Sequence, residues 1–206
     1  MQAPQRLFKP FTADDWVYEV KWDGWRCRAG FGGGVPVEMF TKSGTPCAAW
    51  FPEVVEILSA LPGGYWAVDG ELCVLDEAGR ADFERMQARA MRRRWVPGAQ
   101  VTFMVFDLMV AEGRSVMELP LLERKALLRE ALAGASKTSV LYQGELPARA
   151  ELLSQVAEPL AIEGFMAKHV ASTYRSGERS DWWRKIKTKS FLSRVRQRFG
   201  GRPRRQ

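Results

Sequence analysis

The chain has little of what builds metal centres, disulfide scaffolds and membrane spans. Its 206 residues include one histidine, His169, which excludes a multi-histidine metal centre and any Ser-His-Asp relay that does not use this residue. The three cysteines are widely spaced and form no CxxC pair, so we interpret them as reduced thiols. No apolar run approaches the roughly 18 residues of a membrane helix, and the N-terminus lacks the apolar segment of a signal peptide. We therefore expect a cytoplasmic protein.

The charge that is present is mainly positive. Lys and Arg number 31 against 24 Asp and Glu, a formal net charge of +7. Arginines concentrate in 91–95 and in 194–205. A basic excess of this kind favours a polyanion such as nucleic acid, because binding releases counterions. A merely soluble surface with a disordered tail is the alternative explanation.

The stretch 18–26 carries the most unusual pattern. In a β-strand alternate side chains face opposite sides. Tyr18, Val20 and Trp22 would therefore line a core face, and Glu19, Lys21 and Asp23 would line the other. We expect this strand to continue to about Arg28. A ladder of exposed ion pairs would contribute little stability, so the pattern alone leaves a solvated face and a functional site equally open.

Strands and helices alternate irregularly along the remaining chain. We expect strands over 35–41, 65–75, 101–110, 140–143, 162–170 and 182–187, and helices from 51, 82, 120 and 147, each bounded by Pro or Gly. The glycine run 30–34 indicates a hairpin turn, since it does not have the pattern of a phosphate-binding loop. Asp107 lies inside a nearly continuous apolar strand and would need a buried partner. The mixture predicts an α+β fold with largely antiparallel sheets.

The ordered motifs resemble the nucleotidyltransferase domain of ATP-dependent DNA ligases, an ATP-grasp-like fold of antiparallel sheets flanked by helices. The signature KxDGxR is matched at 21–26, and companion motifs follow in family order at 41–44, 69–71, 83–89, 105–108, 120–125, 163–168 and 183–187. Lys42 stands where ligases usually have arginine. The resemblance covers roughly residues 16–187, most of the chain.

The resemblance implies that Lys21 attacks the α-phosphate of ATP and forms a lysyl-AMP phosphoramide. Lys185 and Lys187, on one strand face, would meet the triphosphate and favour the neutral amine of Lys21, whereas Glu19 and Asp23 would oppose it. Glu71 and Glu163 would lie near the ribose and a Mg²⁺ ion. The implied catalytic residues are Lys21, Lys185 and Lys187, and the implied nucleotide-binding residues are Glu19, Lys21, Arg26, Glu71, Phe106, Glu163, Lys185 and Lys187.

Several of these assignments compete with structural roles. Phe106 would stack on adenine, but an ordinary core phenylalanine has the same sequence signal. Glu71 and Glu163 could be surface carboxylates. Glu163 and Lys168 are five positions apart, which places them on opposite faces of a regular strand unless Gly164 introduces a bulge.

Basic residues outside these motifs suggest how DNA would be held. We expect DNA contacts from Lys42, Arg92, Arg93, Arg94, Arg194 and Arg196. We divide the chain into a nucleotidyltransferase domain, 1–190, and a basic, disordered tail, 191–206. The expected substrate is nicked duplex DNA, which implies association with the nucleoid, and we expect a monomer.

In the ligases that the chain resembles, an OB-fold domain follows the last motif. About twenty residues after Lys187 cannot form a five-stranded barrel. Three explanations stay open: the arginine tail substitutes in part, a partner protein supplies the OB-fold functions, or the enzyme acts mainly from a preadenylated state. Two alternatives to a DNA ligase remain. One is an RNA ligase or a capping-type nucleotidyltransferase, and the other is a noncatalytic DNA-binding module.

Overall fold

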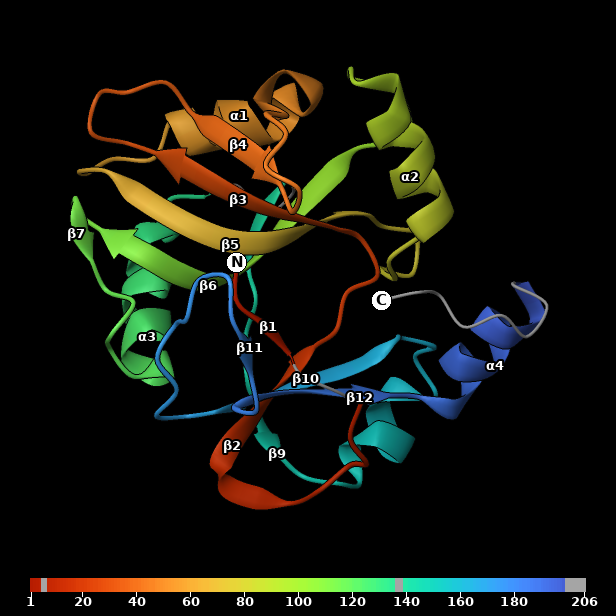
Figure 1. Cartoon of the computed structure of the whole chain (residues 1–206). Helices are drawn as coiled ribbons and strands as arrows, with labels where there is room; N and C mark the ends of the chain where they lie inside the picture. Colours follow the sequence, from red (N-terminus) through yellow and green to blue (C-terminus); the bar gives the residue numbers. More distant parts are fainter. Residues whose placement is uncertain (5–6, 136–138, 199–206) are drawn as a thin grey trace.

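A computed structural model describes residues 1–4, 7–135 and 139–198. The chain forms two main sheets that face each other, with helices on their outer sides, and a third sheet of two short strands (Figure 1). All strand pairs are antiparallel except β1 (Ala3–Pro4) with β11 (Arg179–Ser180), and β6 (Val101–Ala111) with β8 (Val140–Tyr142). The predicted α+β class is confirmed.

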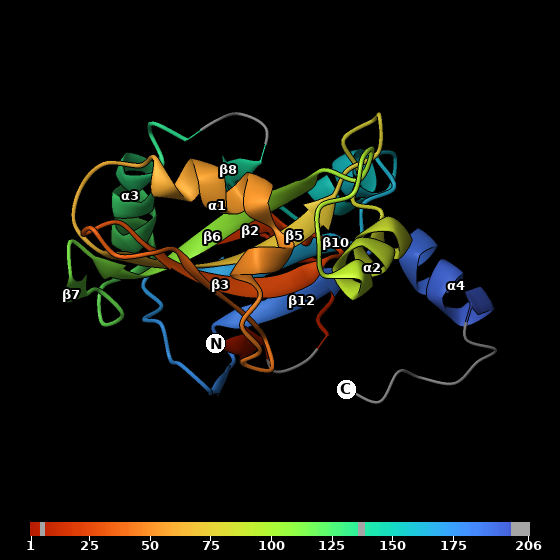
Figure 2. The ribbon, with the colours of Figure 1, turned by 90° about the horizontal axis from the view of Figure 1, so that it is seen from above.

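The larger sheet has the strand order β4-β3-β5-β6-β7, with β8 added beside β6. Its further strands are β3 (Trp25–Phe31), β4 (Glu38–Thr41), β5 (Trp66–Val74) and β7 (Arg114–Ser115). The helices on this side of the molecule are η1 (Ala48–Trp50), α1 (Pro52–Ser59), α2 (Phe83–Arg92) and α3 (Leu121–Ala131). Figure 2 shows α1, α2 and α3 around this sheet.

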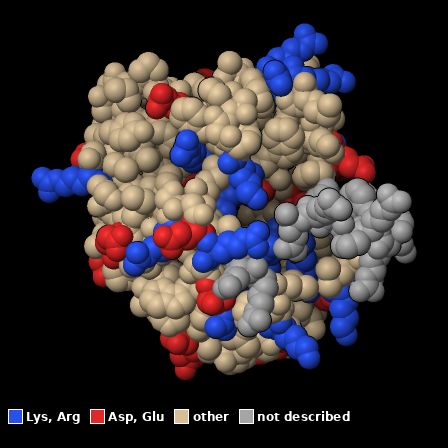
Figure 3. All heavy atoms as spheres, viewed as in Figure 1, with Lys and Arg blue, Asp and Glu red and all other residues tan. Residues whose placement is uncertain are grey.

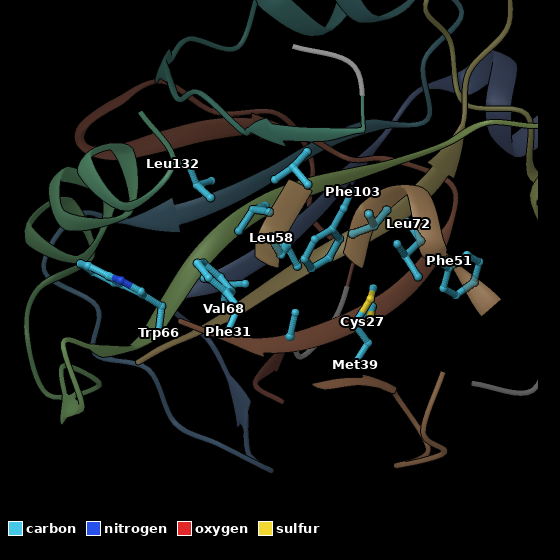
Figure 4. Close-up of a cluster of buried hydrophobic side chains, with 14 of the residues drawn as sticks. Cys27, Phe31, Met39, Phe51, Leu58, Trp66, Val68, Leu72, Phe103 and Leu132 are labelled. Carbon is cyan, nitrogen blue, oxygen red and sulfur yellow. The ribbon is translucent and has the colours of Figure 1, made fainter. Parts of the chain in front are cut away.

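The main hydrophobic core covers the outer face of this sheet. Alternation along β3 and β5 places Phe31, Val68 and Leu72 on that face, where they are buried. Figure 4 shows them packed with Leu58 of α1 and Phe103 of β6. The same alternation turns Arg26, Asp69 and Glu71 to the opposite face, toward the second sheet. This half of the domain thus has one apolar face and one charged face.

The smaller sheet has the order β12-β10-β2-β9, formed by β2 (Ala13–Val20), β9 (Leu146–Ala148), β10 (Gly164–His169) and β12 (Trp183–Lys187). A second apolar cluster lies on its outer face, and Tyr18, Phe165 and Ile186 are fully buried in it. Met166 and Lys185 face the first sheet across a pocket. The side chains of both sheets that meet in the middle are therefore largely charged.

The predicted strand from Tyr18 to Arg28 is wrong in one respect: it is two strands in different sheets. β2 ends at Val20, the Lys21 amide donates to the Gly164 carbonyl at 2.9 Å, and β3 begins at Trp25. The chain crosses between the sheets at Gly24, where a Cβ would lie 2.2 Å from the Leu72 carbonyl oxygen. Glycine is required there because the backbone passes so close to β5.

Two further predictions need correction. The helix predicted from Pro147 is absent, because β9 pairs with β2 there, and only Leu153–Ala157 (η2) is helical. Proline is tolerated in β9 because this strand lies at the edge of its sheet. Helix α4, Lys189–Arg198, occupies the first part of the tail predicted to be disordered. Residues 199–206 lie outside the described residues.

Candidate active site

A pocket of about 310 Å³ lies between the two sheets. Its wall combines residues of the smaller sheet, such as Glu19 and Lys185, with residues of the larger sheet, such as Arg26, Glu71 and Phe106. Five lining residues are Lys or Arg and two are Glu, an excess of three positive charges. Figure 3 shows basic side chains gathered around the hollow between the sheets. A concave site with this charge suits a polyphosphate.

Lys21 lies immediately after β2, at the point where the chain leaves the smaller sheet. Its Nζ is 2.8 Å from Glu163 Oε2, and Lys187 Nζ is 2.7 Å from the other oxygen of the same carboxylate. Glu163 is buried, while the two lysine side chains remain about one fifth to one quarter exposed (21% and 25%). The structure thus brings together the predicted nucleophile, one predicted acid and one predicted triphosphate lysine.

Gly164 explains how Glu163 and Lys168 both reach the space between the sheets. It has φ +145°, and a Cβ there would lie 2.0 Å from the Ile186 carbonyl oxygen. Glu163 precedes β10 and reaches Lys21 across this bend, whereas Met166 and Lys168 line the pocket from the strand itself. The predicted conflict between the two residues is resolved because Glu163 is not part of the regular strand.

The charge state of Lys21 is set by opposing effects. Burial lowers its pKa, but the Glu163 and Glu71 carboxylates outweigh burial, so the pKa lies above its ordinary value. Glu19, which was expected to act here, instead binds two other lysines. Burial and the neighbouring charges of Lys21 and Lys187 lower the pKa of Lys185. Lys21 is therefore an ammonium in the free protein and must lose a proton before it can act as a nucleophile.

Glu71 lies on β5 and faces the same pocket. Burial raises its pKa to about 7, although Lys21 and Arg26 favour the charged form. Its Cγ lies so close to Gly24 that a Cβ on that glycine would meet it at 3.0 Å. Together with Glu163 it offers two carboxylates at one side of the pocket. No cluster of three or more potential metal-ligating side chains occurs within the described ranges.

A buried ionic network fills the space beside the pocket. Glu19 is bound at 2.8 Å by Lys125 of α3 through one oxygen, and at 2.8 Å by Lys168 through the other. The two oxygens of Asp107 accept from Arg124 at 2.8 and 3.0 Å, and Lys168 lies 3.8 Å from Asp107. The predicted need of Asp107 for a buried partner is confirmed. Its partner is Arg124, which the sequence did not single out.

Arg26 is held by a carboxylate and a phenol. Its Nε and Nη2 donate to Asp69 at 3.1 and 2.6 Å, and the Tyr174 hydroxyl donates to Asp69 at 2.6 Å. These contacts hold the pKa of Arg26 above its ordinary value although burial acts against it. The guanidinium lies 5.4 Å from the ring centroid of Phe106. Tyr174 was not predicted from the sequence, because a single tyrosine in a loop has no distinguishing pattern.

Phe106 lines the pocket and is only partly buried. Its ring meets Trp183 edge to face with centroids 6.2 Å apart, and Lys168 Nζ lies 4.7 Å from its centroid. On the neighbouring wall, the Trp22 indole donates a hydrogen bond to the Gln143 side chain. Its place in the pocket wall and its partial burial distinguish Phe106 from the fully buried Phe103 on the same strand.

The residues predicted to contact DNA lie in different places. Lys42 is exposed and borders the pocket. Arg92 is the last residue of α2 and Arg93 and Arg94 follow it, in a region where Figure 3 shows a second basic group. Arg93 has φ 52° and its guanidinium lies 5.0 Å from the Trp50 ring, so it is held against the protein. The side chains of Arg194 and Arg196 lie outside the described part of the chain. No described helix is both long and apolar enough to cross a membrane.

Comparison with known proteins places this geometry in a family. The family described as ATP dependent DNA ligase domain matches residues 1–187. The chain is 32% identical over 168 residues to the multifunctional non-homologous end joining protein LigD of Pseudomonas aeruginosa, covering 82% of this chain and 20% of that protein. It is 33% identical over 180 residues to a probable DNA ligase of Beutenbergia cavernae, covering 86% and 35%.

Among solved structures, mycobacterial DNA ligase D complexed with ATP and MES superposes with a TM-score of 0.72 at 30% identity. The alignment covers 90% of this chain and 60% of that one. The chain therefore spans about a fifth to a third of the curated relatives and over half of the solved ligase chain. The chain belongs to the ATP-dependent DNA ligase domain family.

Proposed function

We propose that this domain carries the adenylation chemistry of a DNA ligase, with Lys21 as the nucleophile. The observation that carries the proposal is the position of Lys21 Nζ beside the pocket, bound to a carboxylate that Lys187 also binds. An amine at the edge of a cationic pocket is placed to meet a nucleoside triphosphate. The relative with ATP in its structure, at 30% identity, supports this assignment.

In the proposed reaction, Lys21 Nζ forms a bond to the α-phosphorus of ATP and the bond to pyrophosphate breaks. The ammonium proton of Lys21 passes to water before attack, and the positive charges of Lys185 and Lys187 favour its loss. The adenylyl group then passes to a DNA 5′-phosphate, which regenerates Lys21. Attack of the 3′-hydroxyl on the adenylylated phosphate joins the strands and releases AMP.

The rest of the pocket would bind and orient the nucleotide. Phe106 offers a ring face for stacking the base. Glu71 and Glu163 would hold a Mg²⁺ ion, which usually binds to one or two carboxylates together with substrate phosphates. When bound, the ion would neutralise charge that develops on the phosphates. Arg26 already donates two hydrogen bonds to Asp69. We therefore assign it a role in orienting the nucleotide, with one face of its guanidinium toward the pocket.

The substrate that we propose is nicked duplex DNA in end-joining repair at the nucleoid, since relatives carry the name non-homologous end joining protein. Lys42, Arg92 and Arg94 would contact its phosphates. Groups that an OB-fold domain supplies in other ligases would come from a partner protein, or from another domain of a longer chain.

The test is sealing of a nicked duplex labelled at its 5′-phosphate, compared with the same nick in RNA. We expect joining of the DNA nick with ATP and none with GTP. Preference for the RNA nick would favour the RNA-ligase alternative. Binding of both substrates without an adenylylated enzyme or DNA intermediate would favour the noncatalytic module.

A further inference from the structure

Lys125 lies on α3, outside the pocket, yet it connects two of the pocket walls. Its side chain is 1% exposed. Its Nζ donates to Glu19 Oε1 at 2.8 Å and to the Gln143 carbonyl at 2.5 Å. The Tyr142 ring lies beneath the ammonium, 4.7 Å from the nitrogen to the centroid. A buried lysine with this many partners has one fixed position.

Two of these partners, Glu19 and Gln143, lead to the pocket. Glu19 is itself a lining residue, and its second oxygen binds Lys168, whose Nζ lies 4.7 Å from the Phe106 ring centroid. Gln143 accepts the hydrogen bond from Trp22, another lining residue. The Glu19 carboxylate is therefore held on the side of the pocket where Phe106 offers its ring.

Burial opposes the positive charge of both lysines that bind Glu19. At Lys168 burial prevails and lowers the pKa, whereas at Lys125 the Glu19 carboxylate outweighs burial and the pKa is raised. Each lysine also has a second carboxylate at longer range: Asp107 lies 3.8 Å from Lys168, and Glu145 lies 3.5 Å from Lys125. For both lysines the 2.8 Å contact with Glu19 is the shortest ion pair.

We propose that Lys125 is a positioning residue that sets the choice of base, by holding the Glu19 carboxylate in the orientation that accepts a hydrogen bond from the amino group of adenine. Guanine carries a carbonyl oxygen in place of that amino group, and this oxygen would face the carboxylate with no proton between them. A buried acceptor left without a donor rejects a ligand more strongly than a lost apolar contact does. The inference rests on the proposed function, in which the base lies on Phe106.

The test compares Lys125→Met with Arg129→Met in the full chain. Arg129 lies on the next turn of α3 and binds Tyr142 and Glu145, but its side chain is 59% exposed and touches no pocket residue. Dissociation constants for ATP and GTP are measured by calorimetry, and thermal melting reports folding. We expect Lys125→Met to lower the preference for ATP over GTP by about tenfold to a hundredfold, and Arg129→Met to leave it within about twofold.

A second pair of variants keeps the test decisive if Lys125→Met does not fold. Glu19→Gln is expected to lower the preference as Lys125→Met does. Adding Lys125→Met to Glu19→Gln is then expected to change the preference by less than about twofold, because Lys125 acts through Glu19. A further large loss in this double variant, or an unchanged preference in a folded Lys125→Met, would overturn the inference. If the wild type prefers ATP and the variants behave otherwise than expected, this inference alone fails. If the wild type binds neither nucleotide, the proposed function fails.

Discussion

The two faces of each sheet have opposite characters. The outer faces pack into apolar clusters around residues such as Phe103 and Phe165, while the facing surfaces carry buried charges such as Glu19, Asp107 and Lys168. An apolar cluster is complete in itself, because burial alone stabilises it. A charged layer is stable only where every charged group has a partner. Most of the lysines and arginines around the pocket are partly exposed, so a bound ligand can supply an anionic partner for them. Stability and chemistry are thus located on opposite faces of the same strands.

The largest expected effect comes from the outer face of the larger sheet. Phe103→Ala removes a fully buried ring from the main cluster, so we expect a loss of about 3–5 kcal/mol in the free energy of unfolding. Urea denaturation measures it. The preference for ATP over GTP should not change in the folded fraction. A loss below about 1 kcal/mol would contradict the assignment of this face as the main source of stability.

A similar loss is expected within the charged layer, but for a different reason. Arg124→Met leaves Asp107 buried with only Lys168 at 3.8 Å, and breaking a buried pair by removing one partner costs about 3–5 kcal/mol. Removing both charges, in Arg124→Met with Asp107→Asn, should recover part of that loss. Equal stability of the single and double variants in urea would show that the charge left behind is not what destabilises the protein.

The pH dependence of stability probes Glu71. Its pKa is raised to about 7 in the folded protein, so between its ordinary range near 4.5 and pH 7 the folded state binds more protons than the unfolded state. Stability therefore falls as pH rises through this window, by up to about 3 kcal/mol, and the effect levels off above pH 7. Glu71→Gln should match the wild type at pH 4.5 and exceed its stability at pH 8. Parallel pH profiles for the two proteins would contradict this.

The smallest effect on stability, and a distinct effect on binding, is expected at the end of α2. Arg92 and Arg94 are exposed. Replacing both with glutamine should leave the melting temperature unchanged and lower the slope of log affinity for duplex DNA against log salt by about 2. Arg93→Gln is the matched control, since Arg93 lies against Trp50. An unchanged slope in the double variant would exclude this surface as a phosphate contact.

The sequence predicted well where a local pattern decides the structure. The strand predicted over 65–75 is present as β5, and the apolar run of β6 correctly implies a partner for Asp107. The identity of that partner was not predictable, because Arg124 lies on a helix that returns to the strand only in the folded chain. The same limit applies to Tyr174, whose contact with Asp69 spans more than a hundred residues.

Tertiary context also overrode local signals. The strand pattern of 18–26 continues through Lys21, but the chain crosses between sheets there and only the close approach of Gly24 to Leu72 reveals it. Pro147 has the position of a helix start, yet it lies in β9, where it pairs with Val17 of β2. The contact of Lys125 with Glu19 joins α3 to β2 and has no signal in either segment.

The most direct test of Lys21 as the nucleophile is the intact mass of the purified protein before and after incubation with ATP and Mg²⁺, beside Lys21→Ala. We expect the wild type alone to gain the mass of one AMP, GTP to add nothing, and a nicked duplex to discharge the adduct. If the wild type already carries AMP when it is purified, its mass should include the AMP from the start, and the nicked duplex should remove it. An adduct of equal yield on Lys21→Ala, or no adduct on the wild type under any of these conditions, would contradict the assignment.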